Sequence, residues 1–300
     1  MATAARRRRW TPVPWAVAAV IVLAVVVWQW PSLPAAPALP SIAVPGLAER
    51  RRADTAELTR RIDALVKGFS GDAAVFVADA GDPTPLYTRD EKEPVVAASL
   101  YKLAVMLHVE TLIERRQLKL SDTITIADED IQYDGSNVYP GDTITIEKAL
   151  ELMITLSDNG IALAFWRIYG PGPITSTAEL AGFRGIVVAK AGEDNVVTAR
   201  AVGELMQRMV EGKLVSQAAS DRMIGRLERQ TVTGRSDALL PKGTRLAHKT
   251  GELVGYFHDA AIVFTPIGPR VVVTLTWDAG EAESTALIAK IAQAAFETAR

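Results

Sequence analysis

The pattern of hydrophobic positions predicts strands at both ends of the folded part of the chain. Apolar residues recur at helical spacing over 47–68 and again over 282–299, so a helix is predicted at each end. Between these two helices, continuous or alternating apolar runs bounded by turn residues predict strands. The predicted strands are 73–79, 85–90, 255–265 and 270–278.

The middle of the chain shows helical spacing instead. Helices are predicted at 99–115, 147–156, 160–169, 198–212 and 216–229. Thr198 and Ser216 are suitable N-caps for the last two, because a hydroxyl oxygen can accept a hydrogen bond from the first helical turn. A polar region with short extended pieces runs from 121 to 147.

Strands at both ends and helices in the middle favour an α/β fold of the α+β type, a sandwich with two lobes. The simplest arrangement is one antiparallel sheet built from both ends of the chain. The helices at 47–68 and 282–299 would cover one face, and the helical lobe would pack against the other side. The seam between the lobes is expected to form a cleft.

The first 45 residues depart from this pattern. A run of arginines precedes an apolar stretch at 15–30, and five prolines follow within 31–45. A membrane span needs roughly 20 apolar residues, and basic residues mark the cytoplasmic side. We therefore expect a cytoplasmic basic segment at 1–14, a transmembrane anchor at 15–30, a linker at 31–45, and a folded domain at 46–300 outside the membrane.

A cleaved signal peptide is the alternative reading of the same segment. Ala36, Pro37 and Ala38 resemble the small-x-small site at which signal peptides are cut. In that case the domain would be secreted instead of anchored.

Composition narrows the classes of function. The chain has 33 basic and 35 acidic residues and a net charge of −2, so no nucleic-acid partner is expected. It has no cysteine, which excludes disulfides, cysteine catalysis and thiolate metal sites. His108, His248 and His258 are scattered without clustered carboxylates, so no metal site is expected.

Ser99 and Lys102 form a candidate catalytic pair. Residues three apart on a helix lie on the same face, so both side chains can point to one spot. A serine hydroxyl is a poor nucleophile until a base accepts its proton, and a desolvated lysine can be that base. The plain alternative is a helix cap followed by a surface lysine, and the pair alone favours that alternative.

Two further short motifs change this balance. Ser157, Asp158 and Asn159 form S-D-N between two predicted helices. Lys249 begins a K-T-G tripeptide just before the strand at 255–265. A given tripeptide is expected by chance in only about 4% of chains of this length.

The trio S-x-x-K, S-D-N and K-T-G in this order resembles the signature of class A β-lactamases and penicillin-binding proteins. The stretches 126–165 and 240–263 also look like the corresponding segments of class A β-lactamases. The resemblance covers roughly residues 50–300. It implies a five-stranded antiparallel sheet flanked by helices from both termini, an all-helical lobe and a site between the lobes.

The resemblance also implies catalytic roles. Ser99 would be the acylated nucleophile, and Lys102 would accept its proton. Ser157 would relay a proton to the leaving nitrogen. The backbone N–H groups of Ser99 and Glu252 would form the oxyanion hole.

Substrate-binding roles follow by the same resemblance. Asn159 would bind the amide side chain of the substrate. Lys249 and Thr250 would hold its carboxylate, and Gly251 would let the strand backbone approach it closely. Arg235, on the loop before the strand, is a candidate second anchor for that carboxylate. The resemblance implies no cofactor.

The chain departs from the class A pattern after the S-D-N motif. Class A enzymes carry a glutamate there that activates the deacylating water. Here Ser157 and Lys249 are 92 positions apart, which is shorter than usual by about the core of that loop, and no Glu-x-x-x-Asn motif stands between them. Glu179 is expected on a solvated helix face. Glu193, in a Gly-Glu-Asp-Asn turn, is the best candidate for a displaced water activator.

The sequence therefore predicts a class A β-lactamase-like serine hydrolase that acts outside the membrane on β-lactam or related acyl substrates. A D,D-peptidase or esterase acting on peptidoglycan-derived or other acyl substrates is one alternative. A sensor that binds penicillin or peptidoglycan without turnover is another, although binding alone needs no proton relay. We expect a monomer held at the membrane by its N-terminal helix.

Overall fold

The computed structural model describes residues 47–299. The segments expected to be a basic tail, an anchor and a linker, at 1–14, 15–30 and 31–45, lie outside the described residues. Within 47–299, no helix combines the length and the apolar character that a membrane crossing requires.

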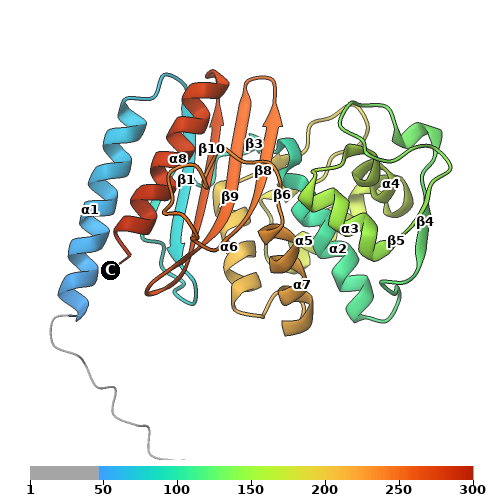
Figure 1. The fold of residues 1–300 in the computed structure, drawn as a ribbon, viewed down its shortest axis with the longest axis horizontal. Helices are drawn as coiled ribbons and strands as arrows, with labels where there is room; N and C mark the ends of the chain where they lie inside the picture. The colour runs from blue at the N-terminus through green and yellow to red at the C-terminus, as the bar shows by residue number, and fades with distance from the viewer. Residues whose placement is uncertain (1–46, 300) are drawn as a thin grey trace, which may run out of the picture. The chain divides into compact units, whose positions relative to one another are not determined.

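One antiparallel sheet of five strands joins the two ends of the described chain, in the order β2-β1-β10-β9-β8 (Figure 1). Its strands are β1 (Asp72–Asp79), β2 (Tyr87–Arg89), β8 (Leu246–Leu253), β9 (Tyr256–Thr265) and β10 (Gly268–Trp277). Asp72 pairs with Trp277, so the first long strand lies beside the last. This confirms the predicted sheet built from both ends of the chain.

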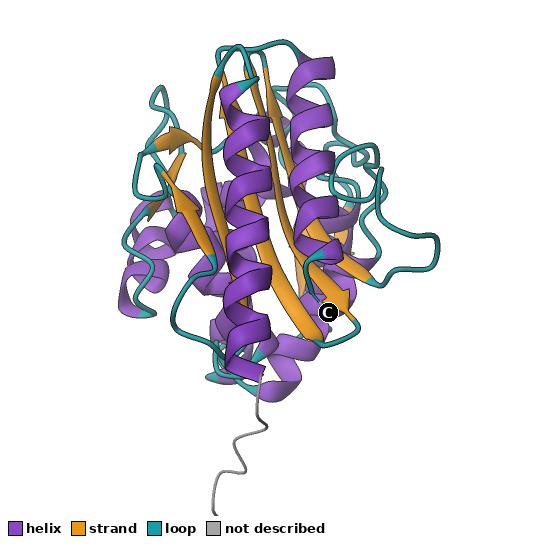
Figure 2. Cartoon of the chain, turned by 90° about the vertical axis from the view of Figure 1, so that its left-hand side faces the viewer, coloured by secondary structure: helices purple, strands orange, loops and turns teal. Residues whose placement is uncertain are grey.

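Two long helices cover one face of the sheet. α1 (Leu47–Lys67) and α8 (Glu281–Glu297) lie side by side over the strands (Figure 2). Val75 and Val77 of β1 point toward them, whereas Phe76 points to the opposite face, as the two-residue period of a strand requires. Because alternate side chains of β1 enter the cores on opposite faces of the sheet, β1 is buried on both faces.

The helical lobe packs against the opposite side of the sheet, as predicted. Its elements are the 3₁₀ turn η1 (Ala98–Tyr101), α2 (Lys102–Glu114), α3 (Ile146–Thr155), α4 (Asn159–Tyr169), α5 (Pro171–Leu180), α6 (Ala199–Val210) and α7 (Gln217–Glu228). α2 runs through the middle of this lobe, and every residue from 102 to 110 is buried. Apart from Lys102, His108 and Glu110, these buried residues are apolar on all sides of the helix, as expected of a helix inside a core.

Short strands and one short turn complete the described chain. β4 (Thr123–Thr125) pairs with β5 (Thr143–Thr145), which confirms the extended pieces predicted between 121 and 147. A second small sheet has the order β3-β7-β6, with β3 (Val95–Val96), β6 (Ile186–Val187) and β7 (Val196–Val197). The turn η2 (Asp128–Asp130) lies between β4 and β5.

Three details differ from the sequence prediction. The helix predicted at 99–115 begins as the 3₁₀ turn η1, and α2 starts only at Lys102. K-T-G precedes the predicted strand, which is β9, but it is itself part of a further strand, β8, that was not predicted. The buried polar residues Lys249 and Thr250 break the apolar pattern of β8. β6 and β7 are too short to leave a pattern of their own.

A buried ion cluster fixes α2 against α7. Glu110 of α2 is fully buried and accepts hydrogen bonds from Arg222, at 2.5 Å, and from Arg226, at 2.5 Å. The carboxylate therefore holds in place the helix that carries Lys102.

Replacing Glu110 should destabilise the fold strongly. Glu110→Ala leaves the two arginines without their anion, and breaking a buried pair in this way costs about 3–5 kcal/mol. The free energy of unfolding, measured by urea denaturation, should fall by that amount. Glu179→Ala, on an exposed position of α5, is the control and should change it by less than about 0.5 kcal/mol. Equal effects of the two substitutions would contradict a stabilising role for the cluster.

Candidate active site

Ser99 lies in the strained turn η1 that leads into α2. Ala98 has a φ of 44°, in the left-handed region that L-residues with a Cβ rarely adopt. The N–H of Ala97 donates to the carbonyl of Asn195 at 2.7 Å, and the N–H of Lys102 bonds back to the Ser99 carbonyl. Backbone strain of this kind persists only where the surroundings enforce it, and it is common at active sites.

Two buried lysines converge on one hydroxyl. Lys102 and Lys249 are both fully buried. Lys102 Nζ lies 3.2 Å from Ser157 Oγ, and Lys249 Nζ donates to the same oxygen at 2.9 Å. The structure thus brings together one residue from each of the three predicted motifs.

Burial shifts the protonation of both amines. Desolvation lowers the pKa of Lys102 to about 7, against the opposing charge of Asp158. Desolvation, followed by the charge of Lys102, places the pKa of Lys249 well below its ordinary value. A lysine with a pKa near 7 has a substantial neutral fraction at physiological pH and can accept a proton.

The S-D-N motif is a tight turn whose three side chains have different tasks. Ser157 has a φ of 57°. Asp158 caps α4 by accepting from the N–H of Ile161 at 2.9 Å. Asn159 Oδ1 accepts from Lys102 at 2.7 Å, and its Nδ2 donates to the Asp134 carbonyl at 2.7 Å. The turn therefore holds Ser157 and Lys102 together, while substrate binding by Asn159 stays a prediction.

The edge strand β8 approaches the turn that carries Ser99 closely at Gly251. A Cβ at this position would lie 3.2 Å from the carbonyl oxygen of Ala97 and 3.2 Å from the ring of His258. A larger residue would push β8 away from the turn. This close approach is the reason that K-T-G ends in glycine here.

Sequence reasoning named no partner for His258, yet this residue joins three strands. Its Nδ1 accepts from the N–H of Thr276 at 3.2 Å, so Nε2 carries the proton and donates to the Val96 carbonyl at 2.8 Å. Burial lowers the pKa of His258 to about 4, so the ring is neutral at pH 7. His258 ties β9 and β10 to β3, just before the turn that carries Ser99. The glycine at position 251 suggests that a neighbour packs tightly against β8, but no local sequence pattern identifies that neighbour as His258.

His248, the residue before Lys249, forms a buried pair with Asp259. Its Nδ1 lies 3.1 Å from both carboxylate oxygens. Burial would lower the pKa of His248, but the charge of Asp259 prevails and raises it. Asp259 also accepts from the N–H of Ser236 at 3.0 Å. The pair fixes β8 to β9 and to the loop that carries Arg235.

Arg235 and Glu252 meet beside β8. The guanidinium of Arg235 is buried, and its Nη2 donates to Glu252 Oε2 at 2.7 Å. Its Nη1 donates to the carbonyls of Gly251 and His258, each at 2.7 Å. Within residues 47–299, the guanidinium of Arg235 is thus bound by two backbone carbonyls and one carboxylate of the protein itself.

Glu193 lies on the exposed turn between β6 and β7. Among residues 47–299, no hydrogen bond or ion pair involves its carboxylate, so nothing there ties it to Ser99. Glu179 is also exposed, on α5, as expected. Within the same residues, no group of three or more histidines and carboxylates could hold a metal ion.

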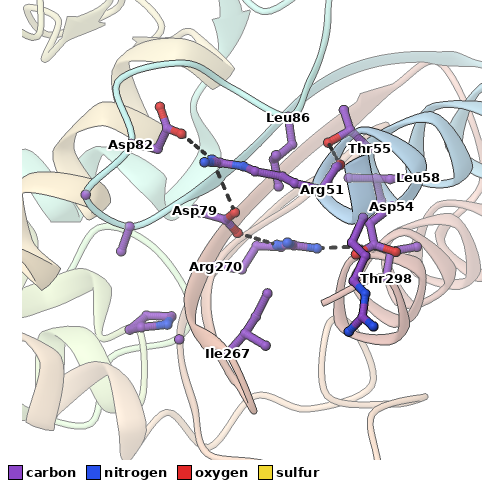
Figure 3. Close-up of a pocket in the computed structure, with 15 residues that line it drawn as sticks. Arg51, Asp54, Thr55, Leu58, Asp79, Asp82, Leu86, Ile267, Arg270 and Thr298 are labelled. Carbon is purple, nitrogen blue, oxygen red and sulfur yellow. Dashed lines mark hydrogen bonds and ion pairs between the residues drawn. The ribbon is translucent and has the colours of Figure 1, made fainter. Parts of the chain in front are cut away.

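A cavity of about 610 Å³ lies elsewhere in the sheet lobe, beside α1 and β10 (Figure 3). Arg51 pairs with Asp79 and Asp82, and Arg270 pairs with Asp79 at 2.7 Å and donates to Thr298 at 3.2 Å. These ion pairs in the cavity wall neutralise one another, and no residue of the three motifs lines the cavity.

Comparisons with known proteins agree with this geometry. The profile of the beta-lactamase enzyme family matches residues 57–299. The extended-spectrum beta-lactamase PER-1 of Pseudomonas aeruginosa is 25% identical over 269 residues, which cover 80% of this chain and 86% of that protein.

Solved structures show the same fold. A beta-lactamase from Sphaerobacter thermophilus superposes with a TM-score of 0.74 at 22% identity, covering 80% of this chain and 97% of its own. PBP-A superposes with a TM-score of 0.74 at 21% identity, covering 80% of this chain and 94% of its own. The α/β fold with its five-stranded sheet is therefore the one predicted, and because the family profile spans most of the sequence, the chain belongs to the beta-lactamase enzyme family.

Proposed function

We propose that the chain is a serine hydrolase that forms an acyl-enzyme at Ser99 with β-lactams or related acyl substrates. The convergence of Lys102 and Lys249 on Ser157 Oγ is the observation that carries the proposal. Burying two amines is costly, and a purely structural site would not need them around a hydroxyl. Membership of the family and the likeness to PER-1 support the same reaction class.

The reaction would begin with proton transfer from Ser99 Oγ to neutral Lys102. The oxygen attacks the carbonyl carbon, and the negative charge develops between the N–H groups of Ser99 and Glu252. Ser157 then passes its proton to the leaving nitrogen as the C–N bond breaks and takes in return the proton that Lys102 accepted, which leaves Lys102 neutral again. Among the described residues no hydrogen bond joins Ser99 Oγ to Lys102 Nζ. Such contacts are often long until substrate binds.

The step after acylation distinguishes the candidate functions. Glu193 is exposed in the short loop 188–195. The resemblance to class A enzymes implies a longer loop with a catalytic glutamate after the S-D-N motif. Slow hydrolysis of the acyl-enzyme would make the chain a penicillin-binding protein instead of a fast β-lactamase. One solved relative, a PBP-A variant described as an acyl-enzyme complex with penicillin-G, superposes with a TM-score of 0.72 at 19% identity, covering 84% of this chain and 96% of its own.

We also propose that the domain works outside the membrane. The proposal rests on the arginine run and the apolar stretch at 15–30, which suit an anchor with its basic end in the cytoplasm. Secretion after cleavage near Ala36 is the alternative. Either location would suit a peptidoglycan-derived or β-lactam substrate.

Incubation with a chromogenic cephalosporin should give a covalent adduct at Ser99. We expect the intact mass of the chain to increase by one acyl group, with colour released slowly after the first turnover. The Ser99→Ala variant should show neither. A wild-type chain with neither adduct nor colour would overturn the proposal and leave the esterase or the non-covalent sensor.

The lifetime of that adduct tests whether Glu193 takes part in its hydrolysis. If Glu193 activates the hydrolytic water, Glu193→Gln should lengthen the lifetime about 10²-fold or more, because general-base catalysis contributes on that order. Glu179→Gln removes an equally exposed charge and serves as the control. Equal lifetimes in wild type and Glu193→Gln would remove Glu193 from the mechanism.

The acylation rate should depend on pH through Lys102. Its pKa of about 7 means that the base is protonated below this value and neutral above it. The second-order rate constant of acylation should therefore fall about tenfold per pH unit below the pKa and level off above it. Lys102→Ala should lower the plateau by roughly 10²–10⁴-fold and abolish the inflection. A flat wild-type profile from acidic to alkaline pH would contradict the role of Lys102.

A further inference from the structure

The two side chains of the Arg235–Glu252 ion pair differ greatly in their exposure to solvent. The side chain of Arg235 is 3% exposed, whereas that of Glu252 is 56% exposed. Arg235 is held by the backbone carbonyls of Gly251 and His258, which cannot turn away. Of the guanidinium's partners in the part of the chain that the structure describes, only the carboxylate of Glu252 can be removed by a side-chain rotation.

The loop that carries Arg235 is fixed as well. Asp237 accepts hydrogen bonds from the N–H groups of Gly234, at 3.1 Å, and Arg235, at 2.9 Å. The N–H of Ser236 is bound to the buried carboxylate of Asp259. These contacts hold the loop, and with it the guanidinium, beside β8. Among the described residues, the exchangeable anion bound by its Nη2 is the carboxylate of Glu252.

Arg235 lies within electrostatic reach of the residues implied to hold a substrate carboxylate. Its charge is among the causes that lower the pKa of Lys249. Glu252 follows Thr250 and Gly251 on β8, and side chains two apart on a strand share a face, so Glu252 and Thr250 lie on the same face. A carboxylate bound at Thr250 would be close both to Arg235 and to the negative charge of Glu252.

We propose that Glu252 is a specificity-determining residue: its carboxylate occupies Arg235 and selects against acyl substrates that carry an anionic group beside Thr250. Substrates that are neutral there are not penalised. The inference rests on the proposed function, since it concerns the same cleft. Arg235, the candidate second anchor for a substrate carboxylate, is bound to the carboxylate of Glu252 instead.

The physical basis is competition for one charge-assisted hydrogen bond. A substrate carboxylate must displace Glu252 from Nη2 and also approach a like charge. Removing the charge of Glu252 leaves the buried guanidinium with an unmet need for an anion, which a substrate carboxylate can satisfy. A gain of one such bond corresponds to at least about tenfold in affinity.

Equilibrium binding in a Ser99→Ala background tests this without any acylation. The probes are benzylpenicillin, which carries the free carboxylate, and its methyl ester, which is neutral at the same place. Adding Glu252→Gln, which keeps the shape of the side chain, should tighten binding of the free acid about tenfold and change that of the ester by less than about twofold. The gain should shrink as salt is raised.

Glu179→Gln in the same background is the matched control, since it removes one exposed negative charge from α5 without touching β8. Thermal melting of both variants checks that they fold. A second variant, Glu252→Lys, should tighten the acid at least as much. If Glu252→Gln changed the affinities for the acid and the ester equally, Glu252 would act through the geometry of the cleft, and the proposal would be overturned. An unchanged or weaker affinity for the acid would also overturn it.

The result separates this inference from the proposed function. If Ser99 forms the adduct but Glu252→Gln leaves the acid-to-ester ratio unchanged, only the inference fails. If the ratio shifts as expected while wild type forms no adduct, only the proposed acyl-enzyme fails. If neither compound binds any variant, both are overturned.

Discussion

The contact of two buried amines with one hydroxyl is the constraint on which the rest of the structure depends. Lys102 and Lys249 have no access to water, so each must find hydrogen-bond acceptors inside the protein or lose its charge. The carbonyl and Oγ of Ser157 meet that need for Lys102, as does the Asn159 amide oxygen. Desolvation nevertheless lowers the pKa of Lys102 to about 7, a value that suits a general base. Burial of the two amines costs free energy, and the same burial lowers the pKa of Lys102 so that it can accept a proton.

The fold makes this contact possible by bringing three distant segments to the seam of the two lobes. α2 lies in the helical lobe, β8 is the edge of the sheet, and the S-D-N turn joins α3 to α4. Glu110 holds α2, the pair of His248 and Asp259 holds β8, and His258 links the sheet to the segment before Ser99. The precision needed for proton transfer therefore comes from buried polar contacts outside the reacting groups.

Much of this fold could be predicted from the sequence, because α1, β1, β9, β10 and α8 carry clear apolar periods. β8 could not, since Lys249 and Thr250 occupy positions where a pattern-based reading expects apolar side chains. The motifs identified the reacting residues only through resemblance to a family. The contact of His258 with Val96 joins positions 162 residues apart, and that of Arg235 with Glu252 depends on how a loop folds back on β8. Long-range polar contacts of this kind leave no local signal, so only the structure revealed them.

The segment after the S-D-N turn shows why acylation and hydrolysis are separable in this architecture. In the proposed reaction, acylation would use only side chains at the seam, whereas hydrolysis would need an additional base from a loop. Here the loop 188–195 is used for structure: Thr175 Oγ1 bonds both to the N–H and to the carbonyl of Val188, and Asn195 binds Ala189 and, through its carbonyl, Ala97. Its backbone holds the turn that carries Ser99 while its acidic side chains face solvent. In the proposed reaction, the backbone of this loop would therefore serve acylation by holding the turn of Ser99, whereas hydrolysis would depend on what its exposed side chains can reach.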